Sequence, residues 1–223
     1  MGQHGNHAAV SSWLIVPALS KLVAIVETNP RRLRGPWASG FALDWHTLSS
    51  TPIGQNQFGH MMFETKRPPV GQLLYELKYG RTQTAAQKQE IAEHLADTAA
   101  HFVQNTWRLV IDAIVPVPPS NVRILQPVMV VAEALAARLG VPVCTACLTK
   151  VKQTPQLKDV TDYDKRAEAL KDAFTVAPEL TAGKSLLLFD DLHGSGATVG
   201  HIVEVLKDPG RAKAIYLLTL TTK

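Results

Sequence analysis

The second half of the chain alternates between two spacings of apolar residues, one typical of buried strands and one typical of amphipathic helices. A mainly apolar stretch that contains Asp112 lies at 110–119, a continuous apolar run lies at 186–189, and a last strand is expected at 212–220. Helical spacing begins at Pro127 and returns at 199–206. Because strands alternate with helices, we predict an α/β fold with a mainly parallel, Rossmann-like sheet and flanking helices.

The first part of the chain is less regular. Apolar residues at helical spacing predict an amphipathic helix over 12–28, which is too short to cross a membrane and carries Lys21. Residues 31–69 mix Trp, His, Gly and Pro without a clear period, so we expect irregular structure there. A short helix over 70–79, closed by Gly80, follows. Within the irregular segment, short strands are expected around residues 41–43 and 61–63.

Two adjacent carboxylates, Asp190 and Asp191, follow the apolar run at 186–189. Ligands of open parallel sheets bind beyond the carboxyl ends of the strands, so both acids are expected at that edge. Neighbouring carboxylates point different ways, which suits two vicinal hydroxyls or a hydrated cation. The pattern predicts a sugar-phosphate site; the alternative is an Asp-rich turn with no ligand.

The residues after the acid pair favour an anion. A phosphate can approach the backbone where side chains are small, and the N–H groups at the start of the next helix attract negative charge. Thr198 adds a hydroxyl at that helix start. The small residues are Gly194, Ser195, Gly196 and Ala197.

This segment resembles the phosphoribosyl-pyrophosphate (PRPP) motif of the type I phosphoribosyltransferases: four apolar residues, two acids, two apolar residues and a small-residue turn ending in Gly-x-Thr. Leu192 fits that motif, whereas His193 and Gly194 depart from it. The resemblance implies the type I phosphoribosyltransferase fold, with residues 192–198 binding substrate. It also implies Mg²⁺ as cofactor, held by Asp190 and Asp191 mostly through ribose hydroxyls or water.

A second segment, Val-Pro-Val-Pro at 115–118, resembles the end of a core strand in the competence-protein-F (ComF-like) branch of these transferases. That resemblance implies a pyrophosphate-binding turn made by Pro119, Ser120, Asn121 and Arg123. The chain departs from the branch in the stretch after Arg123, and it lacks the N-terminal zinc module, since no cysteine precedes Cys144. Taken alone, the Val-Pro-Val-Pro run also fits an ordinary strand end.

A third, Lys-rich segment at 148–174 shares Arg166 and Ala173-Phe174 with ComF-like chains. In that setting Lys150 and Lys152 would be catalytic, neutralising charge that develops on the leaving pyrophosphate. A solvated loop is the plainer interpretation. The resemblance also assigns residues 1–80 to an N-terminal helix and a variable hood, and residues 81–223 to the phosphoribosyltransferase core.

The resemblance implies an enzyme that binds PRPP with Mg²⁺ and transfers its phosphoribosyl group to an unidentified acceptor, releasing pyrophosphate. A non-catalytic PRPP sensor linked to DNA uptake, repair or defence stays open. A phosphatase or nucleotide hydrolase is disfavoured, because the chain has no Walker lysine and no evident nucleophile after the strand.

The composition of the chain limits which ligands and cellular locations we expect. The 223-residue chain carries a formal net charge of +4, which suits an anionic ligand but is too dispersed to indicate DNA binding. Cys144 and Cys147 form a C-x-x-C pair, which is typical of redox sites and half zinc sites; without a second pair we expect buried, reduced thiols and a cytoplasmic protein. We expect no membrane partner and leave a homodimer open.

Overall fold

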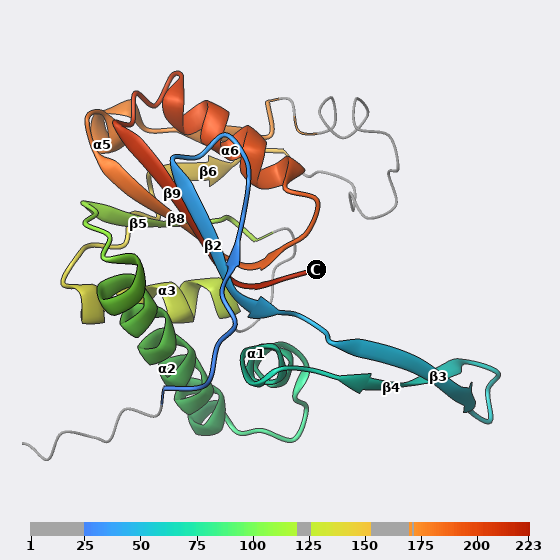
Figure 1. The fold of residues 1–223 in the computed structure, drawn as a ribbon. Helices are drawn as coiled ribbons and strands as arrows, with labels where there is room; N and C mark the ends of the chain where they lie inside the picture. The colour runs from blue at the N-terminus through green and yellow to red at the C-terminus, as the bar shows by residue number, and fades with distance from the viewer. Residues whose placement is uncertain (1–24, 120–125, 153–169, 171) are drawn as a thin grey trace, which may run out of the picture.

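The computed structural model describes residues 25–119, 126–152, 170 and 172–223. Its centre is a five-stranded sheet in the order β1-β2-β9-β8-β5, in which every neighbouring pair is parallel except β1 with β2 (Figure 1). The predicted mainly parallel α/β fold is therefore confirmed. The strands of this sheet are β1 (Arg31–Arg32), β2 (Ser39–Trp45), β5 (Ala113–Pro116), β8 (Ser185–His193) and β9 (Ala214–Thr222).

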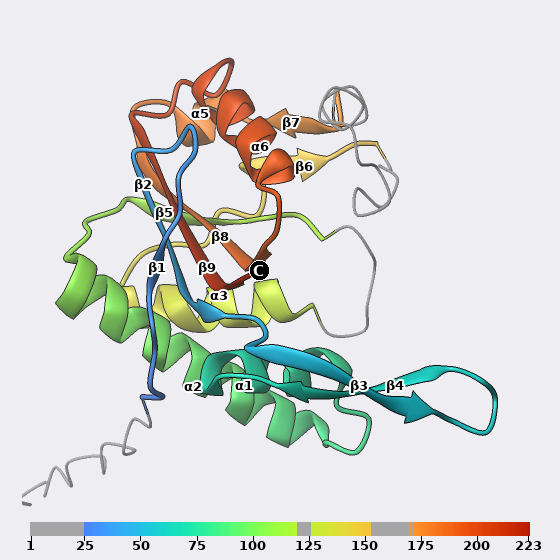
Figure 2. The same cartoon turned by 45° about the vertical axis from the view of Figure 1, so that its right-hand side comes forward.

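Helices cover both faces of the sheet (Figures 1 and 2). Strand β8 shows why both faces need cover: Leu187 and Phe189 enter one core with α1, α2 and α3, while Leu186 and Leu188 enter a second core with α6. The helical elements are α1 (Pro69–Tyr79), α2 (Ala85–His101) with the π-helical turn η1 (Phe102–Trp107), α3 (Pro127–Leu139), α5 (Pro178–Thr181) and α6 (Ala197–Lys207).

Strand β8 is longer than the sequence predicts. The apolar run ends at Phe189, but β8 continues to His193 because β9 still runs beside it, pairing Asp190 with Thr219 and His193 with Thr222. The acid pair therefore lies inside a paired strand and not in the loop after it.

The segment predicted as an irregular hood contributes to the central sheet. Strand β2, which includes the strand expected around 41–43, lies between β1 and β9, with Ala42 and Leu43 fully buried. Helix α1 packs against the sheet from the same part of the chain. The helix expected over 12–28 lies mostly outside the described residues, and Ile25–Thr28 are not helical.

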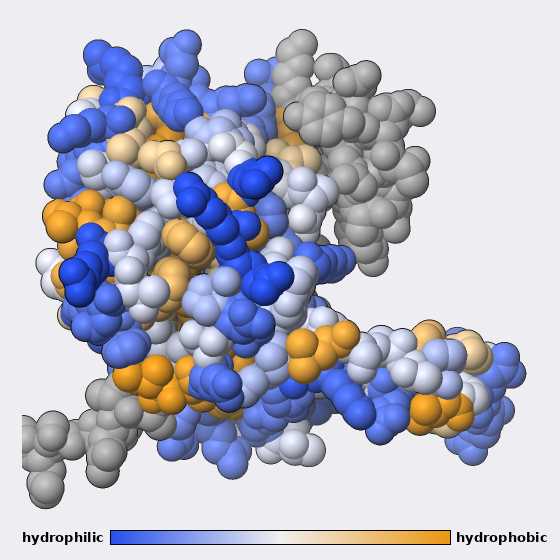
Figure 3. All heavy atoms as spheres, viewed as in Figure 1, coloured by the Kyte–Doolittle hydropathy of each residue, from blue (hydrophilic) through white to orange (hydrophobic). Residues whose placement is uncertain are grey.

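Two small sheets stand apart from the central one. Strands β6 (Leu148–Lys150) and β7 (Phe174–Val176) pair beside α6, where the ring of Phe174 lies 6.2 Å from that of His201. Strands β3 (Ser49–Gln55) and β4 (Met61–Lys66) form a hairpin that projects from the body, with apolar side chains on its surface (Figure 3). No helix among the described residues is long and apolar enough to cross a membrane.

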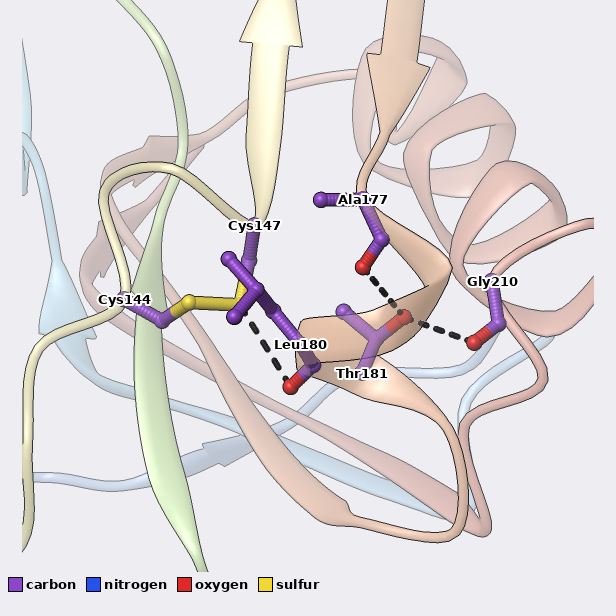
Figure 4. Close-up of a disulfide and its surroundings, with 6 residues drawn as sticks. All are labelled: Cys144, Cys147, Ala177, Leu180, Thr181 and Gly210. Carbon is purple, nitrogen blue, oxygen red and sulfur yellow. Dashed lines mark hydrogen bonds between the residues drawn. A yellow bond between two sulfur atoms is a disulfide. The ribbon is translucent and has the colours of Figure 1, made fainter.

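The expectation of reduced thiols is wrong in this structure. Cys144 and Cys147 form a disulfide, with their Cα atoms 5.3 Å apart (Figure 4). The backbone N–H of Cys144 donates to the carbonyl oxygen of Ile114, which anchors the first cysteine to β5, and Cys147 is buried immediately before β6. A tight turn between two anchored strands brings the sulfur atoms together. The cytoplasmic location stays a prediction, now without the support of free thiols.

Candidate functional site

The acid pair occupies the carboxyl end of β8. The backbone N–H of Asp191 donates to Oδ1 of Asp190 at 2.8 Å, so the first carboxylate is fixed against the strand. Burial and, next, the adjacent negative charge of Asp191 together raise the pKa of Asp190 to about 8. The pair therefore carries less than two negative charges at neutral pH without a ligand.

A lysine that the sequence interpretation missed contacts this pair. The Lys78 ammonium lies 2.8 Å from Oδ1 of Asp191, and both side chains are largely buried. Helix α1 carries Lys78 and approaches the end of β2 closely, because a Cβ on Gly71 would lie only 2.8 Å from the carbonyl oxygen of His46. The sequence predicts the helix that carries Lys78 but gives no local signal for this contact, because Lys78 and Asp191 lie far apart in the chain.

His46 is linked to the acid pair through Thr221 of β9. Its Nδ1 is 3.2 Å from the hydroxyl of Thr221, which itself donates to the backbone oxygen of Asp191. Burial lowers the pKa of His46, and the nearby positive charge of Lys78 lowers it further. A neutral imidazole therefore lies near the acid pair. The sequence had assigned His46 only to the variable hood of residues 1–80.

The predicted anion-binding turn follows directly. Gly196 precedes α6 with φ at 78°, a conformation that favours glycine, and no side chain caps the helix. The N–H groups of its first turn thus lack a side-chain acceptor and can receive an anion. Gly194 lies beside open space, since an added Cβ would meet no protein atom within 4 Å. This geometry leaves room for an anion, and the phosphate turn stays a prediction.

A cavity of about 270 Å³ opens beside the turn. The turn from Ser195 to Ala197 and the segment from Arg34 to Trp37 both line it, as does Glu204 of α6. Arg34 is exposed there and adds a cation that the sequence interpretation did not identify. No local pattern could have found it, because Arg34 lies some 160 residues before the turn in sequence.

His193 supports the floor of this cavity. Its ring meets that of Trp37 edge-on at 5.8 Å, and its Cε1 would lie 3.1 Å from a Cβ on Gly196. Burial lowers the pKa of His193, and its Nδ1 is buried without a hydrogen-bond partner among the described residues. The residue that departs from the motif thus packs under the turn.

The other predicted site residues are only partly placed. The N–H of Val117 donates to the carbonyl oxygen of Phe189, so the chain that leads to the exposed Pro119 starts next to the acid pair. Lys150 ends β6, on a sheet separate from the acid pair, and burial lowers its pKa. Lys152 lies exposed two residues further on. The predicted residues Ser120, Asn121 and Arg123 lie outside the described residues, as do 153–169.

The acid pair suits a substrate-bridged Mg²⁺ better than a protein cage. Across the described ranges, no group of three or more His, Cys, Asp or Glu side chains could hold a metal ion. Mg²⁺ is commonly held by one or two carboxylates, several waters and substrate oxygens, so Asp190 and Asp191 fit it only together with a ligand.

Fold and site together define an α/β protein with a carboxylate pair, a glycine turn and an uncapped helix N-terminus at the carboxyl edge of a mainly parallel sheet. No protein-family model matches the chain, and no curated protein matches it.

Solved structures do match. Glutamine PRPP amidotransferase of B. subtilis, solved with ADP and GMP, is 16% identical over 74% of this chain and 34% of its own, with a TM-score of 0.47. Adenine phosphoribosyltransferase of Saccharomyces cerevisiae is 13% identical over 79% of this chain and 85% of its own, with a TM-score of 0.43. UMP synthase of Leishmania donovani is 14% identical over 77% of this chain and 27% of its own, with a TM-score of 0.36.

The chain thus spans about a third of the length of the amidotransferase. At identities and TM-scores this low, what the protein does must be inferred from its own site.

Proposed function

We propose that the protein binds PRPP with Mg²⁺ and transfers the phosphoribosyl group to an acceptor with release of pyrophosphate. One observation carries the proposal: a single strand, β8, presents two carboxylates and then leads without interruption into a glycine turn and an uncapped helix. A ribose 5-phosphate has vicinal hydroxyls and a phosphate separated by one sugar ring, and these two subsites match that order of groups.

Different residues of the site bind different parts of PRPP. Asp190 and Asp191 accept hydrogen bonds from the ribose hydroxyls, and the backbone from Gly194 to Thr198 binds the 5′-phosphate. Arg34, which lines the same cavity, adds positive charge beside that phosphate. Mg²⁺, when bound, offsets the charge of the pyrophosphate oxygens.

The leaving group is assigned to residues that the sequence predicted. Pro119, Ser120, Asn121 and Arg123 bind pyrophosphate in this proposal, and Lys150 and Lys152 neutralise the charge that develops as it departs. The burial that lowers the pKa of Lys150 supports this role, because a partly desolvated cation interacts more strongly with an anion. The acceptor is a nucleophile that attacks the anomeric carbon while the bond to pyrophosphate breaks.

Calorimetric titration with PRPP and Mg²⁺ tests binding, and a screen of acceptors for pyrophosphate release tests turnover. Binding that requires Mg²⁺ and disappears in the Asp190→Asn, Asp191→Asn double variant is expected. A folded double variant with unchanged PRPP affinity would refute the site.

The Lys78–Asp191 ion pair favours a second candidate, a PRPP sensor without chemistry. A lysine that already neutralises Asp191 lets the site bind ribose hydroxyls without recruiting a metal ion. This candidate agrees with the ComF-like resemblance and a role beside nucleic-acid-handling proteins. It predicts PRPP binding without pyrophosphate release and little dependence on Mg²⁺.

A further inference from the structure

The β3–β4 hairpin exposes an unusual amount of apolar surface. We call residues 48–66 the arm. It projects from the body of the protein, and its tip residue Phe58 is 74% exposed (Figures 1 and 3). Two strands alone are marginally stable in water, and large exposed apolar patches mark interaction sites. The large apolar residues that the arm exposes are Leu48, Ile53, Phe58, Met61, Met62 and Phe63.

Most of the arm lacks the charged side chains that ordinarily protect free strand edges. Residues 48–63 contain no Asp, Glu, Lys or Arg, although these four types make up 19% of the chain. Charged side chains on an edge strand hinder pairing with other strands, and in the arm they occur only at its base, at Glu64 and Lys66. The same lack of charge makes a phosphate backbone or an anionic lipid surface a poor partner, because both are bound by Lys and Arg.

Strand β4 is better suited than β3 to pair with an added strand. Strand β3 contains Pro52, which has no N–H to donate, and its register with β4 shifts between Pro52 and Gly54. Strand β4 contains no proline, is regular from Met61 to Lys66, and pairs only with β3 among the described residues. An added strand would therefore pair with β4.

We propose that the occupant is a second copy of this chain, whose β4 pairs antiparallel with this β4 across a twofold axis at Met62. In that register Met61 lies opposite Phe63 of the other copy, and both share a face with Pro52, the cross-strand neighbour of Phe63. His60 lies opposite the Glu64 carboxylate, so the register also pairs an imidazole with an acid. The result is a self-complementary four-stranded sheet in which Met61, Phe63 and Pro52 of both copies form an apolar cluster on one face.

Sedimentation equilibrium of the full chain tests the proposal. A concentration-dependent dimer is expected, and the triple variant Phe58→Ser, Met61→Thr, Phe63→Thr should be monomeric at least tenfold above the wild-type dissociation constant. The matched control is Val110→Ser, which removes an 87% exposed apolar residue outside the arm and should leave the dimer intact. A wild type that stays monomeric at high concentration, or a triple variant that stays dimeric, overturns the proposal.

Cross-linking tests the register. In a Cys144→Ser, Cys147→Ser background, Met62→Cys should form an intermolecular disulfide on mild oxidation. Lys66→Cys is the control, because the two copies of this position would lie about 27 Å apart along the paired strands. Cross-linking at position 66 and none at 62 would contradict the register. None of these measurements involves PRPP, so the proposal stands or falls independently of the proposed function.

Discussion

The carboxyl edge of the central sheet and the β3–β4 arm are both built from paired strands, but the first is largely buried and the second is exposed. In the central sheet, β8 is flanked by β5 and β9, its apolar residues 186–189 are buried on both faces, and its two acids come where the strand reaches the carboxyl edge. In the arm, both faces are exposed and the apolar residues are at the surface. Burial makes the carboxyl edge of the sheet rigid enough to position a ligand, whereas the arm has exposed apolar surface and no hydrophobic core of its own.

The largest expected difference is in the free energy of unfolding, between a phenylalanine replaced in the central sheet and one replaced in the arm. Phe189→Ala, in β8, should cost about 3–5 kcal/mol of unfolding free energy because it leaves a cavity in a packed core. Phe63→Ala, in the arm, should change the free energy of unfolding of the monomer by no more than about 0.5 kcal/mol. Urea unfolding at a concentration where the protein is monomeric measures both. A large cost at Phe63 in the monomer would show that the arm packs on the body.

Next in size is the loss of the acid pair. The Asp190→Asn, Asp191→Asn variant should weaken Mg²⁺-dependent PRPP binding by at least about 100-fold, because each carboxylate loses charge-assisted hydrogen bonds worth about 1.5–3 kcal/mol. Calorimetry measures the affinity. Asp112→Asn is the control, since that carboxylate accepts the N–H of Ser185 at the other end of β8 and should matter for stability only. The arm triple variant should bind PRPP like the wild type.

A single methyl group at the turn should have a smaller effect. Gly194→Ala fits the free protein without a clash, so any loss of PRPP affinity, expected at about tenfold, reports the ligand's approach to the backbone. Gly200→Ala, one turn into α6, is the control because its methyl makes only an ordinary contact with Pro36. Gly196→Val is less informative, since its positive φ strains any side chain. Unchanged affinity in Gly194→Ala would place the phosphate elsewhere.

The pH dependence should be the mildest effect. The raised pKa of Asp190, about 8, means that the free protein holds a proton there at neutral pH, whereas the proposed complex needs the carboxylate. PRPP binding should therefore release a proton and tighten by somewhat less than tenfold from pH 7 to pH 8, then level off. Calorimetry at pH 7 in two buffers of different ionisation enthalpy measures the proton release. Proton uptake, or affinity that falls with pH, would contradict this account of the acid pair.

Local sequence was enough for the strand, turn and helix from β8 to α6. The apolar run, the two acids, the small residues and the helical spacing are contiguous, so each signal locates the next. The same holds for the α3 helix, with Pro127 in its first turn and a left-handed Gly140 at its end. Even here the end of β8 was placed too early, because pairing with β9 carries the strand past its last apolar residue.

Residues far apart in sequence come together only through sheet order and packing. The insertion of β2 between β1 and β9, the reach of Lys78 to Asp191 and the position of Arg34 beside the turn depend on which strands become neighbours. The disulfide of Cys144 and Cys147 depends likewise on two anchored strands. The sequence by itself therefore determined the fold class and the position of the acid pair and the glycine turn next to each other, since their residues are local. Only the tertiary structure decided which distant cations lie near them and that the apolar residues of the arm stay exposed, because burial is a property of neighbours that local spacing does not encode.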